Sequence, residues 1–290
     1  MTAPDSSSLP VFRELDAAAL HIGLERSRHP GHLGLIAARR AGFAGQTPGL
    51  VLSEPADGDD RFAALRARDR DLIVAGPLDL LEPAAAGCEA IGCIFAASGG
   101  VLVREDRLGR LRGGELLRVA TPSAGPISAG LCRRVLQGWA GNQGFAVAET
   151  QVVVDAMGGD PLDALEAGYD AAWLAYACID AIEAGSRRLA VRLVTTEEVG
   201  LPAVAALELV ARKDRPAEER ARHEALLAAL QEATAALAAA PERALALWQS
   251  EQGGGESDAD IVRATVPFLK ATIDRTPSRC QALHNLFADA

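Results

Sequence analysis

A loop of small residues between an apolar run and a helical pattern is the stretch whose composition best suits the binding of a ligand. The chain passes from an apolar run at 116–119 through the small residues 121–126 into a helical pattern at 127–136. Free backbone N–H groups at a helix start, together with the helix dipole, favour an anion. The loop is therefore predicted to hold a carboxylate, sulfonate or phosphate group, assisted by Ser128. The predicted contacts are Ser123, Ala124 and Gly125.

This loop also has a plainer interpretation, which is a capped helix that binds nothing. Pro126 suits the first turn of such a helix, where its missing N–H is not needed. The spacing matches neither the Walker phosphate loop nor the GxGxxG pattern of dinucleotide-binding proteins. The loop alone therefore leaves both interpretations open.

Further candidates lie where predicted strands end, because open α/β sheets bind ligands at the carboxyl ends of their strands. They are His29, His32, Pro77, Asp79, Ser98, Gly99, Asp155 and Trp173. Trp173 could stack on a flat ring or belong to the core. Asp79 could contact a ligand or only stabilise a helix start. The histidines could bind a ligand or cap the turn around Pro30.

Alternating strand and helix patterns position these candidates. Short apolar strands are expected at 20–24, 50–52, 71–75, 91–96, 101–104, 116–119, 152–154, 171–174, 189–194 and 203–210. Helical patterns separate most of them, and one helix is expected to open at 77–79. The C-terminal part is expected to be helical at 216–252 and 261–273. This alternation predicts an α/β protein with open, mostly parallel sheets flanked by helices.

Length and charge limit the class of protein. The 290 residues suffice for one large domain or two lobes. A net charge of −10 argues against nucleic acid or an anionic membrane as the partner. Residues 1–19 contain acids and prolines rather than the basic start and apolar core of a signal peptide. As written, the sequence predicts a cytoplasmic chain with no membrane insertion, or a periplasmic or cell-surface one if it is a mature form.

The cysteines predict neither a disulfide nor a metal site. The sequence has five cysteines at irregular spacing, and no pair has CxxC spacing. No group of histidines and cysteines has the sequence spacing of metal ligands. Buried free thiols, no metal and no cofactor are therefore expected.

Several segments, taken in order from about residue 20 to about residue 248, resemble the solute-binding proteins of ABC importers. The similar group serves nitrate, alkanesulfonates and thiamine-pyrimidine precursors. PGHLGLIAARRAGF resembles the opening helix of this group, and RFAALRARDRDLIVAGPLD resembles its next helix and strand. VLVREDRLGRLRGGELLRVATPSAG and DPLDALEAGYDAAWL resemble segments of its second half.

The resemblance implies the type II, periplasmic-binding-protein-like fold, with two α/β lobes and a ligand cleft between them. The chain would cross between the lobes near 101–104 and 194–201. Residues 1–19 would form a tail, 20–102 and 199–290 the first lobe, and 103–198 the second. The implied function is binding of a small anionic or heteroaromatic solute, with an ABC permease as the partner.

The alternative function is a cytosolic enzyme built on the same fold, with His29, His32 and Asp79 in the cleft. His32 resembles a histidine at this helix start in the thiamine-pyrimidine members. The related fungal synthase has a lysine and a histidine where this chain has Ala75 and Asp79, and a cysteine-rich return crossing that is missing here. The hydroxybiphenyl-sulfinate desulfinase has a nucleophilic cysteine where His29 precedes Pro30. Binding is therefore preferred over catalysis.

Overall fold

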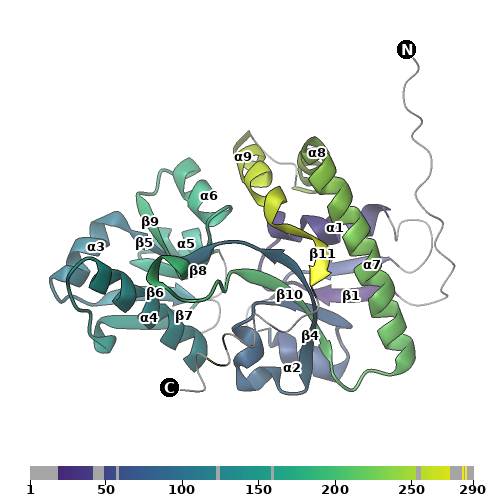
Figure 1. Ribbon diagram of the computed structural model, residues 1–290, viewed down its shortest axis with the longest axis horizontal. Helices are drawn as coiled ribbons and strands as arrows, with labels where there is room; N and C mark the ends of the chain where they lie inside the picture. The colour runs from purple at the N-terminus through teal and green to yellow at the C-terminus, as the bar shows by residue number, and fades with distance from the viewer. Residues whose placement is uncertain are drawn as a thin grey trace, which may run out of the picture.

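The computed structural model describes residues 19–41, 49–56, 59–121, 125–157, 160–252, 256–274, 283 and 285. Its strands form two separate sheets, which lie side by side with helices around each (Figure 1). The chain builds most of the first sheet, crosses to build the second and then returns to complete the first.

The first sheet has six strands in the order β11-β4-β10-β3-β1-β2. They are β1 (Leu20–Gly23), β2 (Leu50–Ser53), β3 (Leu72–Ala75), β4 (Cys88–Ala96), β10 (Ala206–Arg212) and β11 (Leu269–Asp274). β1 pairs with β2 and β3 in parallel, whereas β10 runs antiparallel to both β3 and β4. β11 adds an antiparallel edge next to β4.

The second sheet has five strands in the order β7-β6-β8-β5-β9. They are β5 (Gly99–Arg104), β6 (Leu117–Thr121), β7 (Val152–Ala156), β8 (Ala171–Tyr176) and β9 (Val191–Thr195). β6 pairs with β7 and β8 in parallel, and β5 runs antiparallel to β8 and β9.

Helices from both ends of the sequence accompany the first sheet, and helices from the middle accompany the second (Figure 1). The first group is α1 (Leu33–Ala41), α2 (Arg61–Ala67), α7 (Ala217–Ala239), α8 (Pro241–Gln252) and α9 (Glu256–Thr265). The second group is α3 (Glu105–Arg112), α4 (Pro126–Asn142), α5 (Pro161–Glu166) and α6 (Asp180–Ser186). Short 3-10 turns η1 (Pro30–His32), η2 (Asp79–Leu81), η3 (Pro83–Ala85), η4 (Glu149–Gln151), η5 (Glu197–Val199) and η6 (Val266–Phe268) fill the connections.

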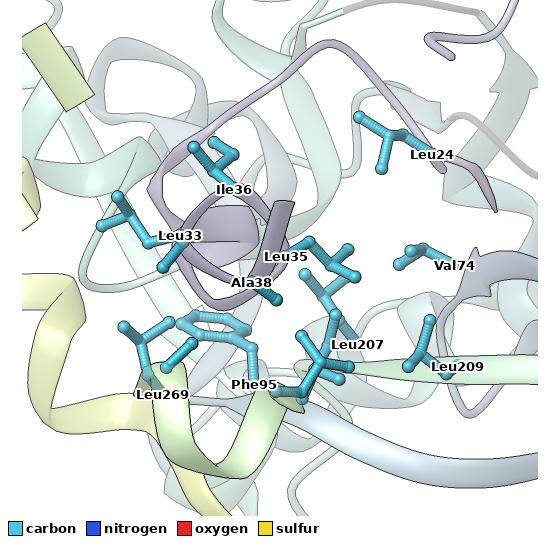
Figure 2. Packing of buried hydrophobic residues seen from close by; sticks show 14 of the residues in the cluster. Leu24, Leu33, Leu35, Ile36, Ala38, Val74, Phe95, Leu207, Leu209 and Leu269 are labelled. Carbon is cyan, nitrogen blue, oxygen red and sulfur yellow. The ribbon is translucent and has the colours of Figure 1, made fainter. Parts of the chain in front are cut away.

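Each sheet has its own hydrophobic core. In the first, α1 places Leu35 and Ala38 against Phe95 of β4 and Leu207 of β10 (Figure 2). In the second, α4 contributes more buried side chains than any other element, Trp139 among them. Burying a side chain the size of leucine contributes roughly 1.5–3 kcal/mol. Two separate cores are what two lobes require.

The predicted two-lobed α/β architecture is confirmed, but the sheets are mixed rather than mostly parallel. Each antiparallel pair of the two sheets includes at least one of the strands that border the two crossings, which are β4, β5, β9 and β10. The chain leaves the first sheet after Ala96 and enters the second at Gly99, so 101–104 lie inside β5. It returns between Thr195 and Ala206. The lobe boundaries given above stay a prediction.

One predicted helix is wrong, and another is right only in its first part. The segment that starts at 77–79 forms only the 3-10 turns η2 and η3, because Pro83 has no N–H to continue a helix. The final predicted helix at 261–273 ends at Thr265, beside Pro267, and the chain continues as β11. This segment therefore extends a sheet rather than a helix.

Cys88, Cys93, Cys132 and Cys178 are buried free thiols, and Cys280 lies outside the described residues. Burial raises the pKa of Cys132 to about 12, so this thiol stays protonated at neutral pH. In the described part of the chain, no helix combines the length and the apolar character that spanning a bilayer requires.

Candidate functional site

Two cavities lie between the sheets, at the carboxyl ends of several parallel strands. The larger, of about 350 Å³, is lined by 26–30 after β1, by Asp160, Asp180 and Glu183 around α5 and α6, and by Trp248, Asp258 and Ile261 of α8 and α9. The smaller, of about 80 Å³, is lined by Gly76–Asp79 after β3, by Thr121 and Ser128, and by Trp173 and Tyr176 of β8, among others. Arg26 borders both cavities. Both sheets therefore contribute to one candidate site.

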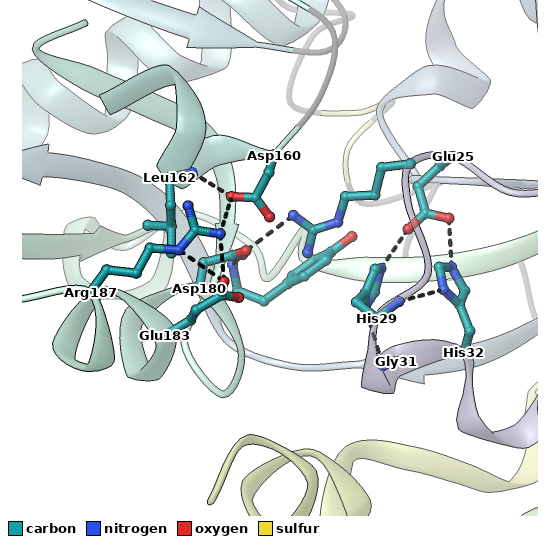
Figure 3. A network of polar contacts seen from close by, with 11 residues as sticks. Glu25, His29, Gly31, His32, Asp160, Leu162, Asp180, Glu183 and Arg187 are labelled. Carbon is teal, nitrogen blue, oxygen red and sulfur yellow. Dashed lines mark hydrogen bonds and ion pairs between the residues drawn. The ribbon is translucent and has the colours of Figure 1, made fainter. Parts of the chain in front are cut away.

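The loop after β1 brings Glu25, His29 and His32 together (Figure 3). The Glu25 carboxylate contacts Nε2 of His29 at 2.8 Å through one oxygen and Nε2 of His32 at 2.9 Å through the other. Pro30 starts the turn η1, and a Cβ on Gly31 would lie 2.7 Å from Cε1 of His29. Glycine is therefore needed for the two histidines to stand side by side.

Backbone hydrogen bonds fix the tautomer of each histidine. The N–H of Gly31 donates to Nδ1 of His29, and the N–H of His29 donates to Nδ1 of His32, both at 3.2 Å. Because each Nδ1 accepts, the proton of each neutral ring lies on Nε2 and is donated to Glu25. Burial, then the neighbouring His32 and Arg26, lower the pKa of His29 well below 6.5, which agrees with a neutral ring.

The carboxylate and ring-nitrogen atoms of Glu25, His29 and His32 that could bind a metal lie within 4.8 Å of one another. The sequence spacing of these residues did not predict a metal site. A histidine that binds a metal normally donates its second ring N–H to an acceptor. Here the second nitrogen accepts from a peptide N–H, so binding through Nε2 would leave a doubly deprotonated ring. The same engagement leaves neither histidine a free lone pair for a general base. The cluster suits a rigid wall of the cavity better than a metal centre or a catalytic dyad.

The N-terminus of α4 is predicted to bind the anionic group of a ligand. In the structure its N–H groups donate to a carboxylate of the chain itself. Glu82, which precedes η3 beside the first sheet, accepts the N–H of Ile127 at 3.2 Å and that of Ser128 at 3.3 Å. Glu82 is buried, and a Cβ on Gly125 would collide with its carboxylate. The helix dipole and the free N–H groups favour an anion at this place. This anion is a side chain from the opposite lobe.

Arg26 and Asp180 form a second connection between the sheets, opposite the histidine cluster. Nη1 of Arg26 donates to Oδ1 of Asp180 at 3.0 Å, and both side chains are at least nine-tenths buried. The guanidinium carbon lies 4.9 Å from the centre of the Tyr176 ring. Burial alone would lower the pKa of Arg26, but Asp180 raises it above its ordinary value. Nε and Nη2 of Arg26 are buried without a hydrogen-bond partner in the described structure.

Four predicted contacts line the cavities, although His29, Asp79 and Trp173 have hydrogen-bond partners of their own. His29 lines the larger cavity, and Pro77, Asp79 and Trp173 line the smaller. Asp79 accepts the N–H of Gly76 at 3.0 Å and lies 3.6 Å from Arg61. The Trp173 side chain is 1% exposed and donates from Nε1 to the Ser128 hydroxyl at 2.9 Å. A stacking role for this ring stays a prediction.

The remaining predicted contacts lie elsewhere. His32 is fully buried behind His29. Ser98 and Gly99 lie at the first crossing, where Gly99 pairs with Tyr176 and fits closely against Ala205. Asp155 pairs with Arg118 at 2.9 Å on β7. None of these four predicted residues lines either cavity described above. Ser123 and Ala124 lie outside the described residues.

Comparison with known proteins agrees with this architecture. Residues 124–244 match a protein-family model described as NMT1/THI5 like. No curated protein sequence matches the chain.

The solved structures that resemble the chain do so along nearly its whole length. The alkanesulfonate-binding protein SsuA from Xanthomonas axonopodis pv. citri bound to MOPS has a TM-score of 0.67 at 16% identity, covering 95% of this chain and 94% of its own. The periplasmic aliphatic sulphonate binding protein SsuA from Escherichia coli has a TM-score of 0.65 at 19% identity, with 94% and 91% covered.

A zinc-bound ligand-binding component of an ABC-type import system from Staphylococcus aureus has a TM-score of 0.70 at 11% identity, with 94% and 92% covered. At these identities the likeness concerns the fold alone, and at that level the predicted resemblance is confirmed. Residues 124–244 are thus similar to the NMT1/THI5-like family model, and the chain has the two-lobed α/β fold seen in the periplasmic solute-binding proteins.

Proposed function

We propose that this protein binds a small organic solute between its two lobes, as the substrate-binding component of an ABC importer. The observation that carries the proposal is the pair of cavities lined by strand ends from both sheets, with Arg26 bordering both. A ligand in this position contacts both lobes and so favours their closure. The larger cavity, about 350 Å³, has the volume of a typical small-molecule site.

Proteins of the same fold support the solute class. Two of them are described as sulfonate-binding proteins, and one of these was solved with MOPS bound. An importer component would act in the periplasm or at the cell surface and deliver its solute to a permease. This location and partner are part of the proposal.

An enzyme on the same scaffold is the weaker candidate. His29 and His32 have both ring nitrogens engaged, and Asp79 contacts Gly76 and Arg61. Binding needs only the mixed polar and apolar walls that the cavities already have. Conversion of a bound compound by purified protein would nevertheless decide for the enzyme.

Native mass spectrometry of the gently purified protein, incubated with a metabolite extract, tests the proposal. We expect one small organic compound to bind with a one-to-one ratio and to be released unchanged when the protein unfolds. The same extract with unfolded protein is the control. A protein that retains no compound from any extract would contradict the proposed function, and a released product that differs from the compound bound would favour catalysis.

A further inference from the structure

Arg26 is a buried arginine with one edge of its guanidinium group unpaired. The side chain is 9% exposed, Nη1 donates to Asp180, and Nε and Nη2 have no acceptor among the described residues. A buried charged donor without a partner is strongly destabilising. The interlobe region is therefore more stable when an acceptor reaches these two nitrogens.

The geometry of the unpaired edge specifies the acceptor. The N–H bonds of Nε and Nη2 lie on the same side of the planar group and run parallel, so they match two oxygens of one carboxylate, sulfonate or phosphate. The Tyr176 ring below the guanidinium and the Asp180 carboxylate beside it hold the plane in one orientation. Asp180 is itself held by the N–H of Tyr176. The edge is pre-oriented for an oxyanion.

The carboxylates that line the larger cavity disfavour a ligand that carries only negative charge. Its carboxylates are Asp160, Asp180, Glu183 and Asp258, and its guanidinium groups are Arg26 and Arg28. Arg187, behind the wall, lies 2.6 Å from Glu183 and 3.8 Å from Asp160, and Arg28 lies 2.8 Å from Glu54. Among the residues that the structure describes, Asp258 accepts the indole N–H of Trp248, at 3.3 Å, and has no other hydrogen bond and no ion pair. Asp258 is therefore available to a cation.

We propose that this cavity binds a zwitterion, with the oxyanion on the Nε–Nη2 edge of Arg26 and a cationic amine facing Asp258. The inference rests on the proposed solute-binding function and adds the ligand class. Both donors are buried in this arrangement, so the ligand enters while the lobes are apart, and Tyr176 and Asp180 orient the edge when the lobes come together. Such separation is possible because Arg26 belongs to the first lobe and Asp180 to the second.

The test uses 3-(N-morpholino)propanesulfonate as a zwitterionic probe, with propanesulfonate and N-propylmorpholine as its anionic and cationic parts. Affinities are measured by isothermal titration calorimetry. We expect wild-type protein to bind the zwitterion at least about tenfold more tightly than either part, because a single well-placed charged contact is worth roughly a factor of ten. Deprotonating the morpholine nitrogen by raising the pH should weaken binding of the zwitterion and leave binding of propanesulfonate unchanged.

Two variants separate the contacts. Arg26→Lys removes the bidentate edge and should weaken binding of the zwitterion and of propanesulfonate by at least about tenfold. Asp258→Asn, which leaves Arg26 intact, should weaken the zwitterion alone. Arg118→Lys, in the exposed pair with Asp155, is the matched control and should change neither affinity. Circular dichroism and thermal unfolding verify that each variant is folded.

The outcomes distinguish this inference from the proposed function. The zwitterion site would be overturned if the zwitterion bound wild type and Arg26→Lys with equal affinity. It would also be overturned if wild type bound the zwitterion and propanesulfonate with equal affinity, or if it bound none of the three probes. If the protein still retained a metabolite from an extract in that case, the solute-binding function would stand and only the ligand class would be wrong.

Discussion

The interlobe region contains two places that attract a negative charge, and they differ in where that charge comes from. At the N-terminus of α4 the anion is Glu82, which the chain supplies from the opposite lobe. At the end of β1, Asp180 accepts from one nitrogen of Arg26, and the other two have no acceptor within the described ranges of the chain. The same electrostatic preference thus produces a structural cap in one place and a candidate ligand contact in the other.

The comparison shows that a free helix N-terminus in the sequence does not identify an anion-binding site. The loop at 121–126 has the composition of such a site, yet the N–H groups of Ile127 and Ser128 already have an acceptor. A ligand oxyanion would have to displace a buried carboxylate there. At Arg26 it would satisfy two donors for which the described part of the chain supplies no acceptor.

Removal of the Glu82 carboxylate has the largest expected effect. Glu82→Ala leaves two N–H groups of α4 without an acceptor, and hydrogen bonds to a charged group contribute roughly 1.5–3 kcal/mol each. We expect urea unfolding to show a loss of about 2–4 kcal/mol in the free energy of unfolding. Glu115→Ala, at an exposed position, should change it by less than about 0.5 kcal/mol.

The Glu82→Ala variant also tests whether the carboxylate keeps other anions away from the N-terminus of α4. Inorganic sulfate should stabilise this variant more than wild type, because the helix N-terminus is then open to an anion. A variant that unfolds like wild type, or that gains nothing from sulfate, would show that Glu82 does not occupy an anion site.

Gly125→Ala should have a smaller effect on the same contact. The new Cβ would collide with the Glu82 carboxylate, which must move away from the N–H groups it accepts. We expect a loss of about 1–2 kcal/mol in the free energy of unfolding. In the Glu82→Ala background this loss should disappear, so a double-mutant cycle measures the coupling.

Gly130→Ala is the matched control on the same helix, since a Cβ there meets nothing within 4 Å. It should stabilise the protein by about 0.5–1 kcal/mol, because alanine favours a helix over glycine. Additive losses from Gly125→Ala and Glu82→Ala would contradict the proposed contact between them.

The smallest expected effect is on how the free energy of unfolding depends on pH, through His29, which lies near Arg26. The pKa of His29 is held well below 6.5 by burial and by the nearby His32 and Arg26, so the unfolded chain takes up a proton before the folded one. The free energy of unfolding should therefore fall as the pH drops below 6.5. His29→Asn keeps an acceptor for the N–H of Gly31 but cannot titrate, and its stability should depend less steeply on pH. Identical slopes would mean that His29 titrates alike in the folded and the unfolded chain, which would contradict its lowered pKa.

Most of the fold follows from local sequence patterns. Apolar runs such as 20–24 and 71–75 become β1 and β3, and the helical spacing at 127–136 becomes α4. Local patterns fail where tertiary context decides. The segment 269–273 has helical spacing, but Pro267 and an open edge next to β4 make it a strand.

The site was only partly predictable, because its main contacts join residues far apart in sequence. The rule that ligands bind at strand ends led to His29, Pro77, Asp79 and Trp173, which all line a cavity. The same rule could have included Glu25 and Arg26, which follow β1 directly. Nothing local connects Arg26 to Asp180, 154 positions away, or Glu82 to Ile127, 45 positions away.

The central claim, that a bound oxyanion rests on Arg26 and not on the α4 N-terminus, can be tested by nuclear magnetic resonance. The measurement is a titration of ¹⁵N-labelled protein with 3-(N-morpholino)propanesulfonate, following the Nε–H signal of Arg26 and the amide signals of Ile127 and Ser128. The Arg26 signal is identified by its loss in Arg26→Lys. We predict a saturable shift of the Arg26 Nε–H signal while both amide signals stay in place. Shifts of the Ile127 and Ser128 amides with an unchanged Arg26 signal would contradict the account.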